Sequence, residues 1–252
     1  MSNFYLIPPL FFAIAFVFSM LGMGGSQLYI PILYWMGLEF KTAAVPLGML
    51  LNVVNSSSAA ITYGRKKLIV WRVAVPFALT MILFAPLGVW LNVQLPVQPL
   101  LIVFALFTAS AAVLMLSGWK PKRGDLAPRA RVALGVGAGS GLGLIAGLIG
   151  RGGGSFVVPL LYIAGLEARN AAATSAIIVT CSGLSSFGSH MATAAQPRWG
   201  VWLASVAAVL LGSQLGSRLM ASRLKSRAVK QIFAVVLLGV AALIIIKDVI
   251  LA

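Results

Sequence analysis

Acidic residues and cysteine are nearly missing from this sequence. Of its 252 residues only 4 are Asp or Glu, charged residues of both signs make up 9% of the chain, and one cysteine is present. Ordinary soluble domains contain about a quarter charged residues, so this composition cannot cover a water-exposed surface. The single cysteine, Cys181, excludes an internal disulfide and a cysteine-rich metal centre. Its apolar surroundings favour a small buried thiol.

Several catalytic and nucleotide-binding motifs are also missing from the sequence. There is no G-x-x-x-x-G-K-[ST] segment, which a phosphate-binding nucleotide loop requires. The apolar segments contain no pair of carboxylates, no group of metal ligands and no Ser-His-Asp set. We therefore expect neither an enzyme nor a cofactor, and energy from ATP would have to come from another protein.

Long apolar runs dominate what is present. Hydrophobic residues make up 60% of the chain, and the mean hydropathy is +1.02. A membrane-spanning helix needs about 20 mainly apolar residues, whereas two apolar stretches, 28–36 and 156–164, follow glycine clusters and reach only about halfway across a bilayer. The sequence predicts an all-α polytopic membrane protein with two short hairpin helices and about eight spanning helices. The predicted spans are residues 4–21, 42–63, 71–91, 99–119, 132–149, 170–192, 199–220 and 229–250.

Basic residues outnumber acidic residues by 19 to 4, which gives a formal net charge of +15. They lie in short stretches between the apolar runs, a pattern typical of cytoplasmic loops held against anionic lipid. We favour this interpretation over nucleic-acid binding, which positive charge alone also suggests. We expect a bacterial plasma (inner) membrane protein whose central basic loop, residues 120–131, is cytoplasmic. The clusters are Arg65, Lys66, Lys67 and Arg72; Lys120, Lys122, Arg123, Arg129 and Arg131; and Arg218, Arg223, Lys225, Arg227 and Lys230.

The chain contains an internal repeat. Residues 21–91 align without a gap onto residues 149–219, which stand 128 positions later. Apolar bias can produce scattered Leu and Ala matches, but not matched Gly, Pro, Tyr, Glu and Trp together. We predict a first repeat at residues 1–119, a linker at 120–131 and a second repeat at 132–252. The matched pairs include Pro31 with Pro159, Tyr34 with Tyr162, Glu39 with Glu167 and Trp71 with Trp199.

Loop charges indicate how the two repeats are oriented. Arg65, Lys66 and Lys67 form a basic loop whose counterpart, residues 192–196, has no basic residue, while uncharged residues 92–98 match the basic loop 221–230. Matching loops therefore lie on opposite faces of the membrane under the positive-inside rule. We predict inverted repeats related by a pseudo-two-fold axis in the membrane plane, with both termini outside.

Two glycine-rich turns occupy the same place in each repeat, at residues 22–26 and 150–155. Glycine permits the positive φ angles and close backbone approach that a turn at membrane depth requires. The short helix after each turn begins with N–H groups and a partial positive charge, which favour an anion. Interrupted helices in two inverted repeats are typical of a transporter site. The alternative is that the glycines only permit close helix packing.

Arg151 distinguishes the two turns, because its counterpart is Met23. At membrane depth it would offer paired donors to sulfonate or carboxylate oxygens; at the interface it would extend to water. Polar residues of the following helices would either line the site or hold helices together. The candidate substrate-binding residues are Arg151, Gly24, Gly25, Ser26, Gln27, Gly153, Gly154, Ser155, Asn52 and Asn55.

Three further residues are candidates for coupling a proton to transport. Glu39 and Glu167 are matched acids, each followed two residues later by a base, Lys41 or Arg169. The alternative role for each is a helix cap paired with its neighbour. The only histidine, His190, is either a proton relay or a solvated residue near a helix end.

The paired G-x-G-G-[GS] … P-x-L-x-x-x-G-[LV] signatures, at residues 22–38 and 150–166, resemble those of the TauE/SafE sulfite exporter family, also called the toluene-sulfonate uptake permease family. The resemblance covers nearly the whole chain. It implies transport, in many members export, of small sulfur-containing anions such as sulfite, sulfoacetate or aromatic sulfonates, mostly across bacterial plasma membranes.

The sequence supports three functional hypotheses. The first is a secondary transporter of a small anion that works by alternating access around the two turns. The others are a membrane scaffold or partner subunit that transports nothing, and a passive anion channel. The expected partners are the small anionic substrate and the lipid bilayer, without nucleic acid. Homo-oligomerisation, proton coupling, the substrate and the direction of transport stay open.

Overall fold

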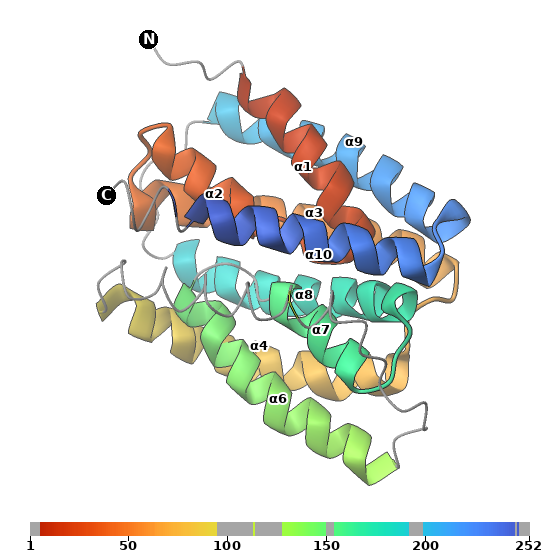
Figure 1. Ribbon diagram of the computed structural model, residues 1–252. Helices are drawn as coiled ribbons and strands as arrows, with labels where there is room; N and C mark the ends of the chain where they lie inside the picture. Colours follow the sequence, from red (N-terminus) through yellow and green to blue (C-terminus); the bar gives the residue numbers. More distant parts are fainter. Residues whose placement is uncertain are drawn as a thin grey trace.

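The computed structural model describes residues 6–94, 113, 128–149, 154–191, 199–244 and 246 (Figure 1). Within these ranges every regular element is a helix. The elements are α1 (Ile7–Leu21), α2 (Ser26–Trp35), a π-helical turn η2 (Phe40–Ala44), α3 (Val45–Arg65), α4 (Trp71–Gln94), α6 (Pro128–Ile149), α7 (Gly154–Ile163), α8 (Ala168–Met191), α9 (Trp199–Arg223) and α10 (Ser226–Ile244).

Among the described residues, four helical segments are long and apolar enough to cross a membrane: Phe40–Arg65, Trp71–Leu91, Ala168–Met191 and Trp199–Arg223. The helical membrane fold predicted from the sequence is thereby confirmed. α1 and the Gly135–Gly147 part of α6 are shorter apolar helices. The predicted span 99–119 lies outside the described residues. α6 begins at Pro128 instead of residue 132, because proline suits the first turn of a helix.

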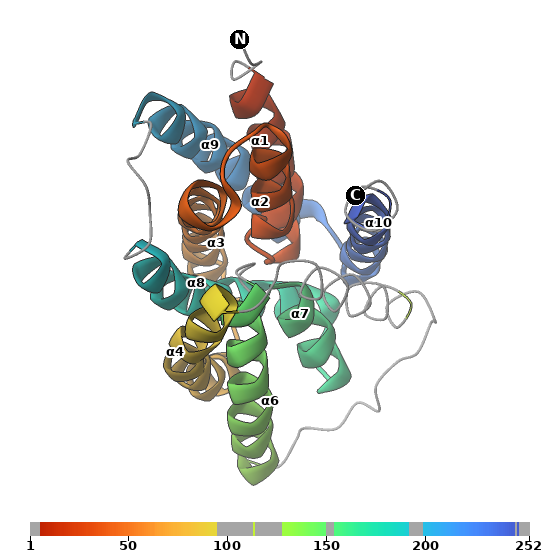
Figure 2. The ribbon, with the colours of Figure 1, turned by 90° about the vertical axis from the view of Figure 1, so that its left-hand side faces the viewer.

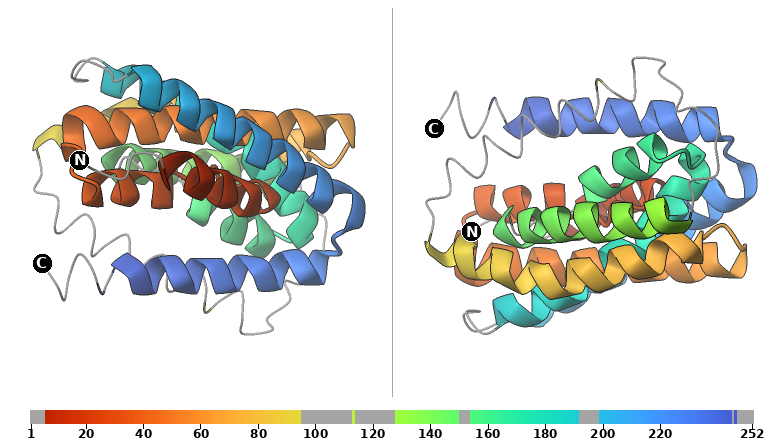
Figure 3. Two further views of the ribbon diagram at one scale, coloured as in Figure 1. Left: turned by 90° about the horizontal axis from the view of Figure 1, so that it is seen from above. Right: turned by 90° about the horizontal axis from the view of Figure 1, so that it is seen from below.

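The helices form a stack of pairs. Figure 2 shows α1 with α9, then α2 with α3, α7 with α8, and α4 with α6. The main contacts join α1 to α9, α3 to α8 and α4 to α6, while α9 also packs on α3 and α4 on α8. α10 lies to one side of this stack in both views of Figure 3. α3 and α8 therefore form the centre of the molecule.

α3 and α8 run in opposite directions. The N–H of Val70, just after α3, donates to Thr174 Oγ1 near the start of α8 at 3.0 Å, and Asn170 Nδ2 donates to the carbonyl of Leu68 at 3.3 Å. Farther from this end of both helices, a Cβ added to Gly183 would lie 3.0 Å from Asn52 Nδ2. The two central helices, which match each other in sequence, are thus antiparallel.

Two basic segments, residues 65–72 and 218–230, contact the first turn of α8 and lie at one end of the molecule. The guanidinium of Arg169 donates to the carbonyl of Ala221, and Ser226 Oγ donates to Glu167 Oε2 at 3.3 Å. Residues 66–70 contact the same end of α8 through Asn170. α1 begins and α10 ends at the opposite end of the molecule (Figure 1).

Glycine faces bring the outer helices into backbone contact. On α6, a Cβ at Gly147 would lie 2.0 Å from the carbonyl oxygen of Ala85 on α4. On α9, a Cβ at Gly216 would lie 2.0 Å from the carbonyl oxygen of Phe16 on α1. In a bilayer such small residues permit the close packing on which helix association depends. Gly147 and Gly216, which lie outside the two predicted turns, thus serve close packing of helices.

We predict that Gly147→Ala lowers the free energy of unfolding in detergent by about 1–3 kcal/mol, because the new methyl group has no room against α4. Gly141 of the same helix has no atom within 4 Å of an added Cβ, so Gly141→Ala is the matched control. Chemical or thermal unfolding of both variants measures the difference. Equal stability of the two variants would contradict the packing assignment.

Candidate functional site

The first glycine turn joins α1 to α2 through three residues with positive φ. Gly22 ends α1 at φ +68°, with the N–H of Met23 donating to the carbonyl of Phe18 at 3.2 Å. Gly24 and Gly25 follow at φ +83° and +97°, and Gly25 is the N-cap of α2. Side chains with a Cβ rarely adopt this conformation. The turn predicted at residues 22–26 is thus present, and its glycines are needed for its backbone path.

The start of α7 lies against this turn. A Cβ added to Gly154, the first residue of α7, would lie 2.3 Å from the carbonyl oxygen of Met23. A Cβ on Gly22 would lie 1.9 Å from the carbonyl oxygen of Ala172 on α8. The first turn therefore meets both the short helix and the long helix of the second repeat. Ser155 lies in the first turn of α7, while Arg151 and Gly153 lie outside the described residues.

Two asparagines of α3 hold the first turn. Asn52 Oδ1 accepts from the N–H of Ser26 at 3.3 Å, and Asn55 Nδ2 donates to the carbonyl of Gly24 at 2.7 Å. Because a backbone N–H must donate and a carbonyl must accept, these bonds fix the orientation of both amides. From α8, Ser175 Oγ donates to the carbonyl of Gly22 at 2.9 Å. Side chains of both repeats therefore satisfy the backbone of the turn.

Buried polar atoms remain beside the turn after these bonds are counted. Both side-chain amide atoms of Gln27, Nδ2 of Asn52, Oδ1 of Asn55 and the hydroxyl of Tyr29 have no hydrogen-bond partner among the described residues. All four side chains are fully buried. A buried polar group without a partner costs about 1–3 kcal/mol. We call Gln27, Tyr29, Asn52 and Asn55 the turn cluster; its donors and acceptors suit a small polar ligand or ordered water.

The turn cluster lies deep in the membrane span. Asn52 and Asn55 stand near the middle of the apolar segment Phe40–Arg65. Gln27, Asn52 and Asn55 are candidates from the sequence, whereas Tyr29 is not among them, because it looks like an ordinary aromatic residue of an apolar helix. The ring of Tyr29 packs against the turn, because its nearest carbon would lie 2.8 Å from a Cβ added to Gly25.

Other polar side chains of the central helices serve as links between helices. Ser213 Oγ of α9 donates to the carbonyl of Asn55 at 2.8 Å, and Gln214 Nε2 donates to Ser58 Oγ at 2.7 Å. Ser185 Oγ of α8 donates to the carbonyl of Ile82 on α4 at 3.0 Å. For these residues the interhelical role holds. Ser213 and Gln214 were missed as partners because no local pattern in the sequence indicates that α9 packs on α3.

The two matched acids lie at the far ends of the hairpin helices, away from the turn cluster. Glu39 caps η2, and its Oε2 accepts from the N–H of Thr42 at 2.5 Å and from Thr42 Oγ1 at 2.7 Å. Slight burial acts to raise the pKa of the Glu39 carboxyl, but the bonds from Thr42 and the charge of Lys41 outweigh it and lower the pKa. Glu167 is exposed and accepts from Ser226. The cap interpretation therefore fits Glu39.

His190 differs from the solvated end residue that the sequence suggested. It lies in the last turn of α8 but is only 2% exposed. The suggestion failed because the end of α8 is covered by other parts of the protein. Cys181 is half-buried rather than fully enclosed.

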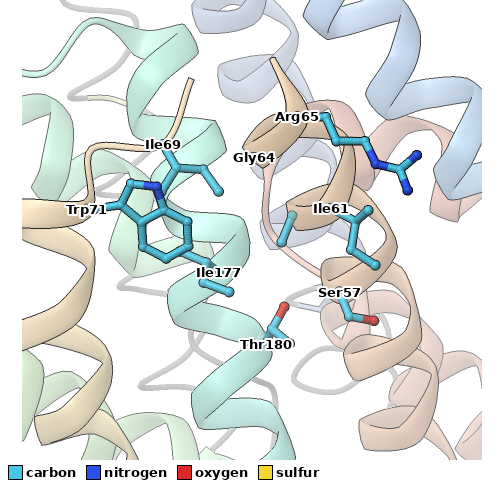
Figure 4. A pocket seen from close by; sticks show the side chains of 9 residues that line it. Ser57, Ile61, Gly64, Arg65, Ile69, Trp71, Ile177 and Thr180 are labelled. Carbon is cyan, nitrogen blue, oxygen red and sulfur yellow. The ribbon is translucent and has the colours of Figure 1, made fainter. Parts of the chain in front are cut away.

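A separate groove of about 380 Å³ lies between α3, α8 and the start of α4. Figure 4 shows Ile69, Trp71 and Ile177 on one side of it and Ser57, Ile61 and Arg65 on the other. The groove shares no lining residue with the turn cluster. The groove is thus distinct from the site that the glycine turns predict.

The cap at Glu39 leads to a pH-dependent prediction. Because the folded pKa is lowered, the stability from this cap is complete at neutral pH and is lost as pH falls through the folded pKa, below the usual carboxyl value of about 4.3. We expect Glu39→Ala to lower the melting temperature at pH 7, and we expect its difference from the wild type to shrink as pH falls below the usual carboxyl pKa of about 4.3.

Thermal unfolding across this pH range measures the effect. Glu167→Ala is the control, because Glu167 is the matched acid of the second half and its carboxylate accepts from Ser226, the first residue of α10. A gap between wild type and Glu39→Ala that stays constant with pH would contradict the cap.

Comparison with known proteins places this geometry in a family. The model of the family "Sulfite exporter TauE/SafE" matches residues 7–244. A "Probable membrane transporter protein" of Xylella fastidiosa strain Temecula1 is 29% identical over 250 residues, covering 92% of this chain and 91% of that protein. Another of the same name from strain 9a5c is 28% identical over 239 residues, again covering 92% and 91%. No solved structure matches the chain.

The family is one of membrane transporters, and both relatives are named as probable ones. Together with the apolar helices, these matches over most of the chain indicate a multi-pass transporter in a lipid bilayer that has a small-molecule substrate and is not an enzyme. The chain belongs to the sulfite exporter TauE/SafE family.

Proposed function

We propose that the protein is a secondary transporter of a small oxyanion, of the sulfite or organosulfonate class, and that the turn cluster forms part of its substrate site. The observation that carries this proposal is the group of fully buried polar atoms of Gln27, Tyr29, Asn52 and Asn55 without described partners, beside a helix start at mid-span. In a bilayer such atoms need a ligand or ordered water.

The chemistry of the turn cluster suits an oxyanion. Asn52 and Gln27 have amide N–H donors available, and the first turn of α2 adds the partial positive charge of a helix N-terminus. In our proposal Arg151, from the second turn, supplies the full positive charge and a paired set of donors. Gly154 contacts Met23, so the short helix that follows Arg151 begins beside the first turn. The family's printed name supports the sulfur-oxyanion class.

We further propose that the two halves are inverted repeats, in which helices of each half pack against helices of the other half. α3 and α8 match in sequence and are antiparallel. The contacts of α1 with α9 and of α3 with α9 correspond to those of α6 with α4 and of α8 with α4. α2 and α7 also end alike: Leu38 N–H donates to Leu33, and Leu166 N–H to Leu161, both at 3.1 Å.

Inverted repeats support alternating access, in which the halves rock about a site between them. The two basic segments next to α8 lie at one end of the molecule, which supports a cytoplasmic position for that end in a bacterial inner membrane. Both termini are then outside. Export of the anion is the direction we propose, on the strength of the family name.

Gln27→Leu tests the turn cluster. We expect flux of labelled sulfite into or out of proteoliposomes to fall about tenfold or more, because the substrate loses a hydrogen-bond partner. Stability is expected to hold or rise, since two buried polar atoms without partners are removed. This combination separates a binding residue from a structural one, which would lose stability. Gln231→Leu, on the exposed side of α10, is the control; unchanged flux in Gln27→Leu removes Gln27 from the site.

Arg151→Ala tests the charged partner. We expect sulfite to stop raising the melting temperature and flux to fall about tenfold or more, with Arg151→Lys keeping part of both, because lysine retains the charge without the paired donors. Arg223→Ala, at the exposed end of α9, is the control.

A ligand that binds only the folded protein adds about 2.7 kcal/mol to the free energy of unfolding when its concentration is one hundred times its Kd. If neither sulfite nor any sulfonate stabilises the wild type, a scaffold without transport is favoured instead.

A further inference from the structure

The groove between α3, α8 and the start of α4 has an apolar interior. Its two hydroxyl groups are engaged inside their own helices: Ser57 Oγ donates to the carbonyl of Val54 at 3.2 Å, and Thr180 Oγ1 to that of Ala176 at 2.7 Å. The remaining walls include Ile61, Ile69 and Ile177. A small oxyanion entering here would lose its hydration without gaining donors. The interior instead suits a hydrocarbon chain.

The rim of the groove has the opposite character. Arg65 and Trp71 belong to its lining, and the neighbouring Lys66, Lys67 and Arg72 are exposed. Trp71 exposes 55% of its surface, as expected of a tryptophan at the boundary between lipid and water. A basic cluster at this level attracts anionic lipid headgroups. An apolar groove below a basic rim is complementary to one kind of molecule, an amphiphile with a negative head.

We propose that this groove binds an anionic phospholipid, with an acyl chain between α3 and α8 and the headgroup phosphate beside Arg65 and Arg72. The volume of about 380 Å³ lies within the range of about 300–1,000 Å³ that small-molecule sites occupy. The sequence counterpart of Arg65, Lys66 and Lys67, at residues 193–195, has no charge. The attraction for an anionic headgroup is therefore confined to one face of the membrane.

The bound lipid touches both halves of the chain, because α3 belongs to the first half and α8 to the second. Under the alternating access proposed above, a change in the angle between α3 and α8 alters the width of the groove. Lipid in the groove would therefore favour one conformation over another. This consequence rests on the proposed function, whereas the binding of lipid does not.

The test uses the full-length protein, delipidated in detergent, with phosphatidylglycerol and phosphatidylcholine of identical chains. Thermal unfolding and native mass spectrometry measure stabilisation and retained lipid. We expect phosphatidylglycerol to raise the melting temperature more than phosphatidylcholine. The double variant Arg65→Gln, Arg72→Gln is expected to bind phosphatidylglycerol about thirtyfold more weakly. Lys41→Gln removes a positive charge from η2, next to the opposite end of α3 and outside the groove, and should leave binding unchanged.

A second pair of variants tests the chain site. Ile177→Trp fills the groove and is expected to abolish retention of phosphatidylglycerol, whereas Leu203→Trp, at a position 66% exposed on α9, should not. Equal stabilisation by the two lipids in the wild type, or full retention in Ile177→Trp, would overturn the proposal. Both readouts are independent of sulfite, so failure of the transport proposal leaves them interpretable.

Discussion

A broken helix inside a membrane must find partners for its own backbone, and the architecture around residues 22–26 follows from that requirement. The turn uses three glycines with positive φ, and its carbonyls and N–H groups are met by Asn52, Asn55 and Ser175. Two of these side chains come from α3 and one from α8. The antiparallel central pair is therefore the frame on which the turn is built, and a change in the relation of α3 to α8 acts directly on the turn.

The bonds that hold the turn also define what is left for a substrate. In each asparagine, one atom of the side-chain amide is hydrogen-bonded to the backbone of the turn and the other has no described partner. The atom without a partner is a donor, Nδ2, in Asn52 and an acceptor, Oδ1, in Asn55. Gln27 keeps both. In the proposed site, one asparagine side chain thus combines a structural role toward the turn with a binding role toward the substrate. A substitution at Asn52 or Asn55 changes both roles, whereas one at Gln27 changes only the second.

The sequence predicted the first turn and the helices of the described residues because lengths of apolar runs and glycine clusters are local signals. It also identified Gln27, Asn52 and Asn55, since polar residues in such runs are costly and need a reason. It did not predict which atoms would be engaged, because Ser175 reaches Gly22 across 153 positions of the chain. Burial of His190 near a helix end was missed for the same reason: the groups that cover a residue are set by packing between distant segments.

The two halves differ where the central helices cross. By the repeat alignment Asn52 and Asn55 match Thr180 and Gly183. An added Cβ at Gly183 would lie 3.0 Å from Asn52 Nδ2, so a side chain at position 183 requires the amide of Asn52 to shift away from the bond that it accepts from Ser26. Glycine at 183 and asparagine at 52 are thus sterically matched. The first half supplies the amides at this crossing, and Arg151, opposite Met23 in the alignment, is the charged residue that only the second turn contains.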